Sequence, residues 1–400
     1  MFSVKNRLHI LFAAIFITAC ILIFFVFSYP KTKTFYHHGE FGTKDLLTNW
    51  ASVQVFLLGE NPYDSNQMLP FVQRWGYAER TPPAAWFPPW AIVLLSLVYF
   101  LDFPIVVVIW FVINLVIVYL ITLLIVSVYA NREIKFIYLE IAAIIFYPLW
   151  ALLRWGHIGL LLPLGLAGTI WAFKKGDDRL AGLFMVLLMM KAHVVYLILL
   201  YITLWIINQK RWTAMIWFAG GLSFLMFVAF IWNHSIFEWW FLSFYTKAGN
   251  YRAATLVGWM RGLLINIQGY PAKWPMILVP FCAIALLLYG FYVKRALRSI
   301  EEIIPVVACV SVLTAPYAWM HDFVIILVTQ IALICRTCGV GSIQRVRAEV
   351  ISAIVVLNLI TFILGKNVFH SSHEYFWFPA VLLLLWFRGN RLRENQLNNN

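Results

Sequence analysis

The chain has 400 residues, of which 63% are apolar or aromatic and 12% are charged, and its mean hydropathy is +0.83. A soluble domain is about half apolar and a quarter charged, so this composition excludes a soluble globular enzyme and a disordered chain. Long unbroken apolar runs also differ from the weak alternating segments of a transmembrane β-barrel. The composition therefore predicts an all-α, polytopic membrane protein, in which each span needs roughly 20 apolar residues.

The net charge of +13 comes from 30 Lys and Arg against 17 Asp and Glu. Basic residues of membrane proteins gather in cytoplasmic loops and fix the topology. Because no soluble domain is present to carry a basic surface, we expect no nucleic-acid partner. The sequence has no P-loop, no dinucleotide glycine fingerprint and no His-Glu-x-x-His helix. Nucleotide-driven chemistry is therefore unsupported, and no cofactor is predicted.

The first apolar run, at about residues 8–28, follows two basic residues and predicts a retained signal anchor. The run at 86–101 begins Trp86-Phe87-Pro88-Pro89-Trp90, which favours an interfacial or re-entrant helix, because Pro suits a first turn and aromatics suit an interface. About 12 spans then remain, and both termini are cytoplasmic. The alternative makes 86–101 a span and 180–207 one kinked span, but it leaves fewer basic residues inside.

We expect one integral-membrane domain over residues 1–400. Its first external loop, 29–104, contains interfacial helices, and a second large external loop covers 233–274. The end of the chain, 389–400, forms a cytoplasmic tail. This topology gathers the unusual polar residues on the external face, which spans alone would not require.

The first loop contains a segment, 45–59, that predicts a helix with one polar face. Asp45, Asn49 and Ser52 share that face at i, i+4 and i+7. Gly59 is a plausible end for the helix. Asp45 is therefore a candidate functional carboxylate where the first span leaves the membrane. Alternatively, it only complements the helix dipole from the first turn.

A turn follows this helix, and it contains Tyr63 and Asp64. Its simplest interpretation is a corner in the chain. Further along, Lys191 and His193 interrupt the apolar stretch 180–207. Ionisable groups at membrane depth are costly and are usually functional, and these two are able to hold a phosphate at an external helix junction. The alternative is a Lys side chain that snorkels to the surface.

Three other segments carry polar chemistry. Arg154-Trp-Gly-His157 and Trp319-Met-His321-Asp322 each lie between apolar helices. A His–Asp pair can orient a proton-transfer group or bind a sugar. The 233–274 loop combines Arg252 and Arg261 with an aromatic cluster. Such aromatics are usually membrane anchors, but they also suit sugar or prenyl contacts.

The ordered set of these motifs resembles the GT-C superfamily of integral-membrane glycosyltransferases. More narrowly, it resembles glycosyltransferase family 87, the polyprenyl-phosphate-mannose-dependent α-mannosyltransferases. The resemblance extends over roughly residues 1–325 and depends on the order and spacing of its parts. These parts are the Asp45 helix, Gly59-Glu-Asn-Pro-Tyr63-Asp64, Phe87-Pro88-Pro89, Gly156-His157, Ala181-Gly182 leading to Lys191, and Pro316-Tyr-Ala-Trp319-Met-His321.

The chain departs from the family pattern at several of these positions. Phe87 stands where the family has Tyr, and His157 stands where Gln is commoner. Ala192 follows the Lys where Pro is frequent, and Asp322 stands where a second His is common. These differences concern the identity of the sugar and the acceptor more than the class of reaction.

The resemblance implies inverting sugar transfer from a lipid phosphate, with no obligate metal. Asp45 is implied as the general base, a role that is typically worth 10²–10⁴-fold. A single carboxylate suffices, because inversion requires only one attack. Positive charge for the departing phosphate is expected from Lys191 and His193, with Arg252 and Arg261. The sugar or acceptor pocket is expected to contain Asn49, Tyr63, Asp64, His157, Trp319, His321 and Asp322.

The implied donor is polyprenyl-phosphate mannose, with another hexose or a pentose left open, and the acceptor is a glycolipid, a glycan or a protein. We expect a bacterial cytoplasmic (inner) membrane and an external active site, where the donor arrives with the membrane lipid. A transporter or flippase of a lipid-linked sugar is the first alternative, and it predicts mid-bilayer charges and repeated halves. A non-catalytic lipid-binding subunit is the second. The absence of a visible repeat favours the enzyme.

Overall fold

The computed structural model describes residues 44–77, 85–130, 143, 145–247, 253–268, 273–292, 299–338, 344–367 and 372–398. Within these ranges every regular element is a helix, and none is a strand. The predicted all-α fold is therefore confirmed. The predicted first span, at residues 8–28, lies outside the described residues, as does Arg252.

Four described helical segments are long and apolar enough to cross a membrane. They are Phe103–Tyr129, Ile158–Lys175, Trp212–Trp232 and Met320–Thr337. The third is the least covered by protein, since only 11% of its most apolar window is buried. Such an apolar helix needs lipid around it. A polytopic membrane protein is thus confirmed, whereas the count of about 12 spans stays a prediction.

The chain divides into two compact units, so the prediction of a single domain remains a prediction. Unit 1 consists of Met1–Ile117, Leu153–Ile158 and Leu225–Lys247. Unit 2 consists of Val118–Leu152, Gly159–Phe224 and Ala248–Asn400. The described helices of unit 1 are α2 (Lys44–Leu57), α3 (Ser65–Gln73), α4 (Pro89–Tyr99), the first part of α5 (Phe103–Tyr129), the end of α11 (Trp212–Trp232) and α12 (Ile236–Lys247).

Helix α2 is the predicted helix of the first loop, and it is buried on more than one face. Leu46 and Leu47 are at most 1% exposed, as the apolar pattern requires. However, Ser52 on the predicted polar face is also buried, and its hydroxyl donates to the carbonyl of Pro62 at 3.0 Å. The polar face of α2 therefore binds other parts of unit 1 instead of lying open.

Side chains of α2 satisfy the free carbonyls at the end of α4. The last carbonyls of a helix have no partner within it. Trp50 donates its indole N–H to the carbonyl of Leu101 at 2.8 Å, and Gln54 donates to the carbonyl of Tyr99 at 2.6 Å. Helix α4 itself begins with Pro89 in its first turn, as the sequence predicts. These bonds fix α2 against α4.

The end of α2 is fixed in the same way by the junction of α11 and α12. Gly59 has a φ of +79°, which ends the helix in the left-handed conformation that glycine adopts without strain. Trp232 donates its indole N–H to the carbonyl of Phe56 at 2.9 Å, and Asn233 donates its amide to the carbonyl of Gly59 at 2.6 Å. Hydrogen bonds between side chains and backbone carbonyls thus hold α2 against α4 and against the α11–α12 junction.

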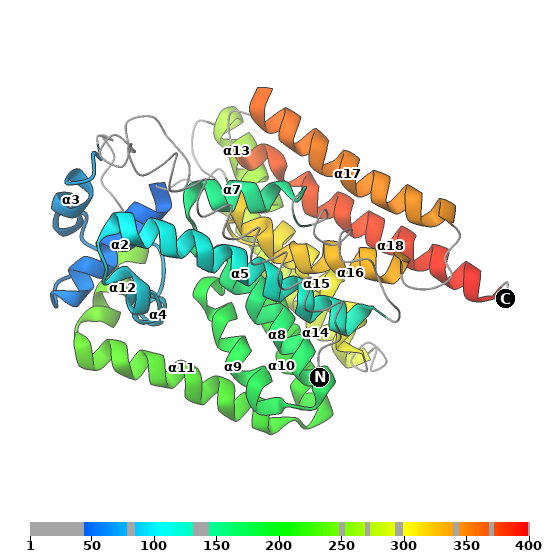
Figure 1. Ribbon diagram of the computed structural model, residues 1–400, viewed down its shortest axis with the longest axis horizontal. Helices are drawn as coiled ribbons and strands as arrows, with labels where there is room; N and C mark the ends of the chain where they lie inside the picture. Colours follow the sequence, from blue (N-terminus) through cyan, green and yellow to red (C-terminus); the bar gives the residue numbers. More distant parts are fainter. Residues whose placement is uncertain are drawn as a thin grey trace, which may run out of the picture. The chain divides into compact units, whose positions relative to one another are not determined.

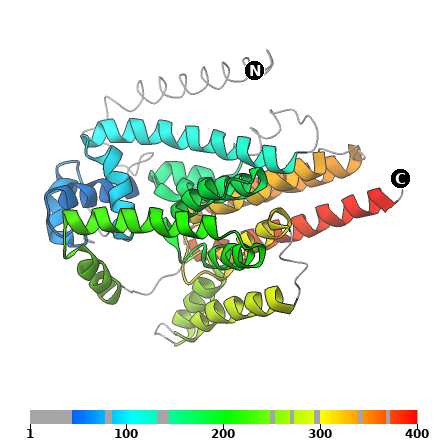
Figure 2. The same cartoon turned by 90° about the horizontal axis from the view of Figure 1, so that it is seen from below.

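Unit 2 contains most of the remaining helices (Figure 1). Its last two, α17 and α18, lie side by side in Figures 1 and 2. The predicted tail from residue 389 is largely a continuation of α18. The elements after α5 are α7 (Tyr147–Trp155), η2 (Ile158–Leu160), α8 (Leu161–Lys175), α9 (Asp178–Leu188), η3 (Met189–Lys191), α10 (Tyr196–Gln209), α13 (Leu256–Gln268), η4 (Trp274–Ile277), α14 (Leu278–Tyr292), α15 (Ile300–Thr314), η6 (Met320–Ile326), α16 (Leu327–Cys338), α17 (Gln344–Asn367), η7 (Ser372–Tyr375) and α18 (Trp377–Asn398).

Helices α8 and α9 pack against each other, and α10 contacts α8 where the ring of Trp205 lies 4.7 Å from that of Phe173. A two-residue turn joins α8 to α9, and Arg211 after α10 forms an ion pair with Asp178 at the start of α9, at 2.9 Å. Gly182 lets the backbone of α9 approach the start of α11 closely, because a Cβ at this position would lie 2.3 Å from the carbonyl oxygen of Ala214. The turn after α9, which carries Lys191, therefore lies at the opposite end from this ion pair.

Candidate active site

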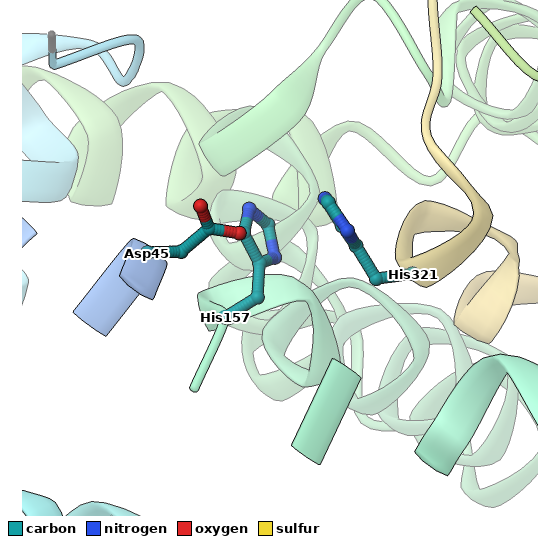
Figure 3. Close-up of side chains that lie close together, drawn as sticks. All are labelled: Asp45, His157 and His321. Carbon is teal, nitrogen blue, oxygen red and sulfur yellow. The ribbon is translucent and has the colours of Figure 1, made fainter. Parts of the chain in front are cut away.

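In unit 1, Asp45 and His157 lie together. Asp45 is in the first turn of α2, and His157 follows α7, which ends at Gly156 with a φ of +65°. A carboxylate oxygen of Asp45 and a ring nitrogen of His157 lie within 4.8 Å of each other, and the two side chains face one another in Figure 3. Asp45 is partly exposed, whereas His157 is only 7% exposed.

This pair has the residue types of general acid–base chemistry. A carboxylate can accept a proton from a hydroxyl group, and an adjacent imidazole can orient the carboxylate or share the proton. Asn49 lies one turn further along α2 and is 7% exposed. The sequence indicated Asp45 from the helix pattern and His157 from the Gly156-His157 motif, each independently. The structure brings these two side chains together.

Tyr63 and Asp64 both have structural contacts. The hydroxyl of Tyr63 donates to the carbonyl of Phe87 at 3.2 Å, and burial raises the pKa of Tyr63 well above its ordinary value, so the hydroxyl keeps its proton. A carboxylate oxygen of Asp64 accepts the N–H of Asn66 at 2.9 Å and so caps the start of α3. The predicted place of these residues in a sugar pocket stays a prediction.

In unit 2, two of the predicted site residues, Lys191 and Asp322, form an ion pair. The ammonium of Lys191 lies 2.7 Å from Oδ1 of Asp322, and the two side chains are 12% and 0% exposed. The other oxygen of Asp322, Oδ2, accepts the backbone N–H of Trp319 at 2.9 Å. A buried carboxylate needs partners of this kind, because an unpaired charge is costly in an apolar interior.

His193 lies two residues after Lys191, and its ring stacks on Tyr317 with the centroids 4.0 Å apart. Its Nε2 atom is buried and has no hydrogen-bond partner among the described residues. Burial is the main cause that lowers the pKa of His193 to about 3; the Lys191 ammonium also lowers it, and Asp322 partly opposes the change. The imidazole is therefore neutral at physiological pH.

Polar bonds attach the turn with Lys191 and His193 to the end of α15. Ser311 donates to the carbonyl of Val194 at 2.8 Å and accepts the N–H of Leu197 at 3.3 Å. The hydroxyl groups of Tyr196 and Thr314 lie 2.8 Å apart. These contacts hold the backbone on either side of the Lys191 turn in one position.

His321 and Trp319 lie on or beside η6 in the same unit. Nε2 of His321 lies 3.9 Å from Oδ1 of Asp322, and Figure 3 shows the ring of His321 on its helix. Ala315 has a ψ of 145°, which ends α15 before Pro316 as the sequence predicts. The His321-Asp322 motif therefore lies beside Lys191, since Asp322 contacts both the Lys191 ammonium and the His321 ring.

Arg261 lies on α13, and its Nε is buried without a hydrogen-bond partner in the described part of the chain. The segment before α13 reaches η6, because the N–H of Ala254 donates to the carbonyl of Ala318 at 2.7 Å. No described contact joins Arg261 to Lys191. Its predicted contact with a phosphate therefore stays a prediction.

Tyr317, Ser311 and Gln54 make contacts that the sequence did not predict. A weak signal existed for Tyr317, which stands beside the helix-breaking Pro316 within a motif that was already of interest. Ser311 and Gln54 are single polar residues in otherwise apolar helices, and they are recognisable only once their partner carbonyls are known.

The all-helical membrane fold, the Asp45–His157 pair of unit 1 and the Lys191–Asp322 ion pair of unit 2 are consistent with a polytopic membrane enzyme of the GT-C type. The model of glycosyltransferase family 87 matches residues 86–320, more than half of the chain, and the chain belongs to this family. The protein is therefore a glycosyltransferase. Comparison with curated proteins and with solved structures finds no match.

The matched range includes His157, Lys191 and His193. Asp45 lies before it, and His321 and Asp322 follow directly after its end. The range matched by the family model thus includes the Lys191 turn but not Asp45, the carboxylate of the first loop.

Proposed function

We propose that the protein is an inverting glycosyltransferase that transfers a sugar, most simply mannose, from a polyprenyl-phosphate donor. The acceptor is a glycolipid, a glycan or a protein on the external face of a bacterial cytoplasmic membrane. Membership in family 87 supports the glycosyl transfer. The apolar helices support a donor that arrives within the membrane.

In the proposed reaction, Asp45 is the general base. Its carboxylate takes the proton of the acceptor hydroxyl as that oxygen attacks the anomeric carbon. The bond from the anomeric carbon to the phosphate oxygen breaks, and its electron pair leaves with the polyprenyl phosphate. One displacement inverts the anomeric carbon. The observation that carries the proposal is the position of Asp45 beside His157, which suits a base with an orienting neighbour.

The proposed ligand of the departing phosphate is Lys191, because an ammonium stabilises the negative charge that develops on the leaving oxygen. His193, two residues after Lys191, remains a candidate ligand of the same phosphate. Arg261 and Arg252 remain candidates for a second positive charge. His157, Asn49, Trp319 and His321 are proposed to line the sugar or acceptor pocket.

The test is sugar transfer by the purified protein in lipid, measured with radiolabelled polyprenyl-phosphate mannose and a membrane glycolipid extract. Asp45→Asn keeps the size of the side chain and removes the base, so we expect a loss of about 10²–10⁴-fold in the transfer rate. Asp102→Asn, which changes an exposed carboxylate of unit 1, is the matched control and should retain full activity.

Transfer that survives in a folded Asp45→Asn variant would move the base to another carboxylate. If the wild type transfers no sugar from polyprenyl-phosphate mannose or from other polyprenyl-phosphate hexoses and pentoses, this proposed function is wrong. A flux assay with the same labelled lipid would then test the transporter, and lipid binding without transfer or flux would indicate a non-catalytic subunit.

A further inference from the structure

The carboxylate of Asp322 has a position that does not suit a sugar ligand. Its side chain is 0% exposed. Oδ1 accepts from the ammonium of Lys191 at 2.7 Å, and Oδ2 accepts from the backbone N–H of Trp319 at 2.9 Å. A sugar hydroxyl must reach an oxygen in order to bond to it, and neither oxygen is accessible here.

The side chain of Lys191, unlike that of Asp322, is accessible from outside the protein, since it is 12% exposed. An ammonium group has three donors, and among the described residues the partner of Lys191 is Asp322 alone. The ammonium can therefore use its remaining donors for an anion from outside the protein while it keeps the bond to Asp322.

The two groups come from elements far apart in the sequence. Lys191 ends η3, whereas Asp322 lies in the first turn of η6, 131 residues later. The bond from the Trp319 N–H fixes the carboxylate to the start of η6. Since a Lys side chain has four flexible carbons, a fixed partner restricts the ammonium to one place.

The electrostatic surroundings make this partner necessary. Among the described residues, Asp322, His321 and His193 interact electrostatically with Lys191 or with one another, and Tyr317 stacks on His193, whereas residues 161–170 of the packed α8 contain no titratable group. His193 is neutral and cannot compensate a charge. Asp322 is therefore the anionic partner that compensates the charge of Lys191 in this apolar region.

We infer that Asp322 is a positioning residue for Lys191: it holds the ammonium in the place where it can bind the phosphate of a lipid-linked donor. This inference rests on the proposed role of Lys191. It replaces the expectation that Asp322 contacts the sugar or the acceptor. Its effect is on the donor phosphate only, so the acceptor should not be sensitive to it.

The experiment measures the binding of radiolabelled polyprenyl phosphate to the purified, lipid-embedded protein between pH 6 and 9, together with donor and acceptor KM values. Asp322→Asn keeps an acceptor for the Trp319 N–H and removes the charge. We expect donor-phosphate binding to weaken about 10- to 100-fold, which is the loss found when a residue that orients a ligand-binding side chain is replaced. The weakening should be seen throughout this pH range, because the Asn side chain carries no charge at any pH and the ion pair with Lys191 is lost. Acceptor KM should stay unchanged.

A double-mutant comparison separates this role from simple stabilisation. Lys191→Met should lose binding, and Lys191→Met/Asp322→Asn should lose no more than Lys191→Met alone, because Asp322 acts through Lys191. The matched control is Asp178→Asn, which breaks the Arg211–Asp178 pair of the same unit and should leave binding intact. If Asp322→Asn fails to fold, Asp322→Glu keeps the charge and displaces the ammonium, so binding of the polyprenyl phosphate should weaken while the acceptor KM stays unchanged.

The inference is wrong if a folded Asp322→Asn variant binds polyprenyl phosphate like the wild type at every pH. It is also wrong if only the acceptor KM rises, or if the double variant binds more weakly than Lys191→Met. A wild-type protein that binds the lipid phosphate with this dependence on Asp322, but transfers no sugar, would support the inference and contradict the proposed function.

Discussion

The side-chain amide of Asn233 donates a hydrogen bond to the carbonyl of Gly59, 2.6 Å away and 174 residues earlier in the chain. The oxygen of the same amide accepts the N–H of Ser235 at 3.0 Å, in the turn that precedes α12. The triplet Asn233-His234-Ser235 matches a glycosylation sequon. Its amide, however, is 8% exposed and already bonded, so the triplet has a structural use in unit 1.

Asn233→Asp tests the bond to α2. Aspartate keeps the acceptor for Ser235, but it loses the donor and puts a negative charge against the carbonyl of Gly59. We expect a loss of stability of about 1–3 kcal/mol and a slower transfer rate, since α2 carries Asp45. Thermal unfolding and single-turnover transfer measure these effects. Asn208→Asp, an exposed position, is the control for charge, and an unchanged melting temperature in Asn233→Asp would refute the prediction.

Gly156 offers a comparison between backbone strain and catalysis. Gly156 and Gly176 have φ values of +65° and +78°, and Ala at either position should cost about 1–2 kcal/mol. Only Gly156 precedes His157, whose ring lies beside Asp45. We therefore expect similar losses of thermal stability in both variants but reduced transfer only in Gly156→Ala. Equal activity in the two variants would show that the position of His157 has no influence on the reaction.

The buried imidazole of His193 predicts a pH dependence of stability. Its pKa is about 3 in the folded protein, against an ordinary value of 6.5 that applies to the unfolded chain. Because the unfolded chain binds the proton first, the stability contribution is complete above pH 6.5 and is lost as the pH falls toward 3. At pH 5 the loss should be about 2 kcal/mol.

Melting temperatures of wild type and His193→Gln between pH 7 and 5 measure this effect. The variant should show a flatter dependence, because Gln does not titrate. His234→Gln, at an exposed position in unit 1, should retain the wild-type slope. A parallel decline in the wild type and His193→Gln would assign the pH dependence to other groups.

Removal of divalent metal ions should leave the transfer rate unchanged. The proposed reaction uses a carboxylate base and an ammonium for the leaving phosphate, and it requires no Lewis acid. Transfer by the purified protein in lipid, with and without excess EDTA, is the measurement. A rate that falls in EDTA and returns with added Mg²⁺ or Mn²⁺ would contradict the prediction.

Local helix signals were the part of the fold that the sequence predicted well. Periodicity and Gly59 predict α2 almost to its ends, and Pro89 marks the start of α4. The cap at Asp64 was also recognisable, because Asp64 followed by Gln67 at the third helical position is a capping pattern. We interpreted that segment as a turn with a sugar contact, and the helix beyond it was missed.

The long-range partners were beyond such reasoning. Lys191 and His321-Asp322 were each chosen because ionisable residues are rare in apolar stretches, but nothing local joins residues 131 positions apart. The same holds for Trp232, whose indole bonds to a carbonyl of α2. A backbone carbonyl has no sequence signature, so contacts to carbonyls follow only from the fold.

The short length of α9 and η3 has a consequence for the lipid around the protein. Helix α9 has 11 residues and η3 has 3, so together they rise only about 22 Å. The hydrocarbon core of a bilayer is about 30 Å thick. Charged residues gather at the start of α9 and the end of α10, which marks that end as the aqueous one.

With α9 as a membrane-crossing helix, which stays a prediction, the turn with Lys191 meets the opposite headgroups only where the bilayer becomes thinner, and a helix shorter than its bilayer causes such thinning at a modest cost. The protein should thus compress the membrane beside this turn and draw lipid phosphates inward toward the ammonium. Vesicles of lipids with shorter acyl chains would relieve that compression, so the thickness of the host membrane becomes a variable that adjusts how readily the enzyme meets its donor.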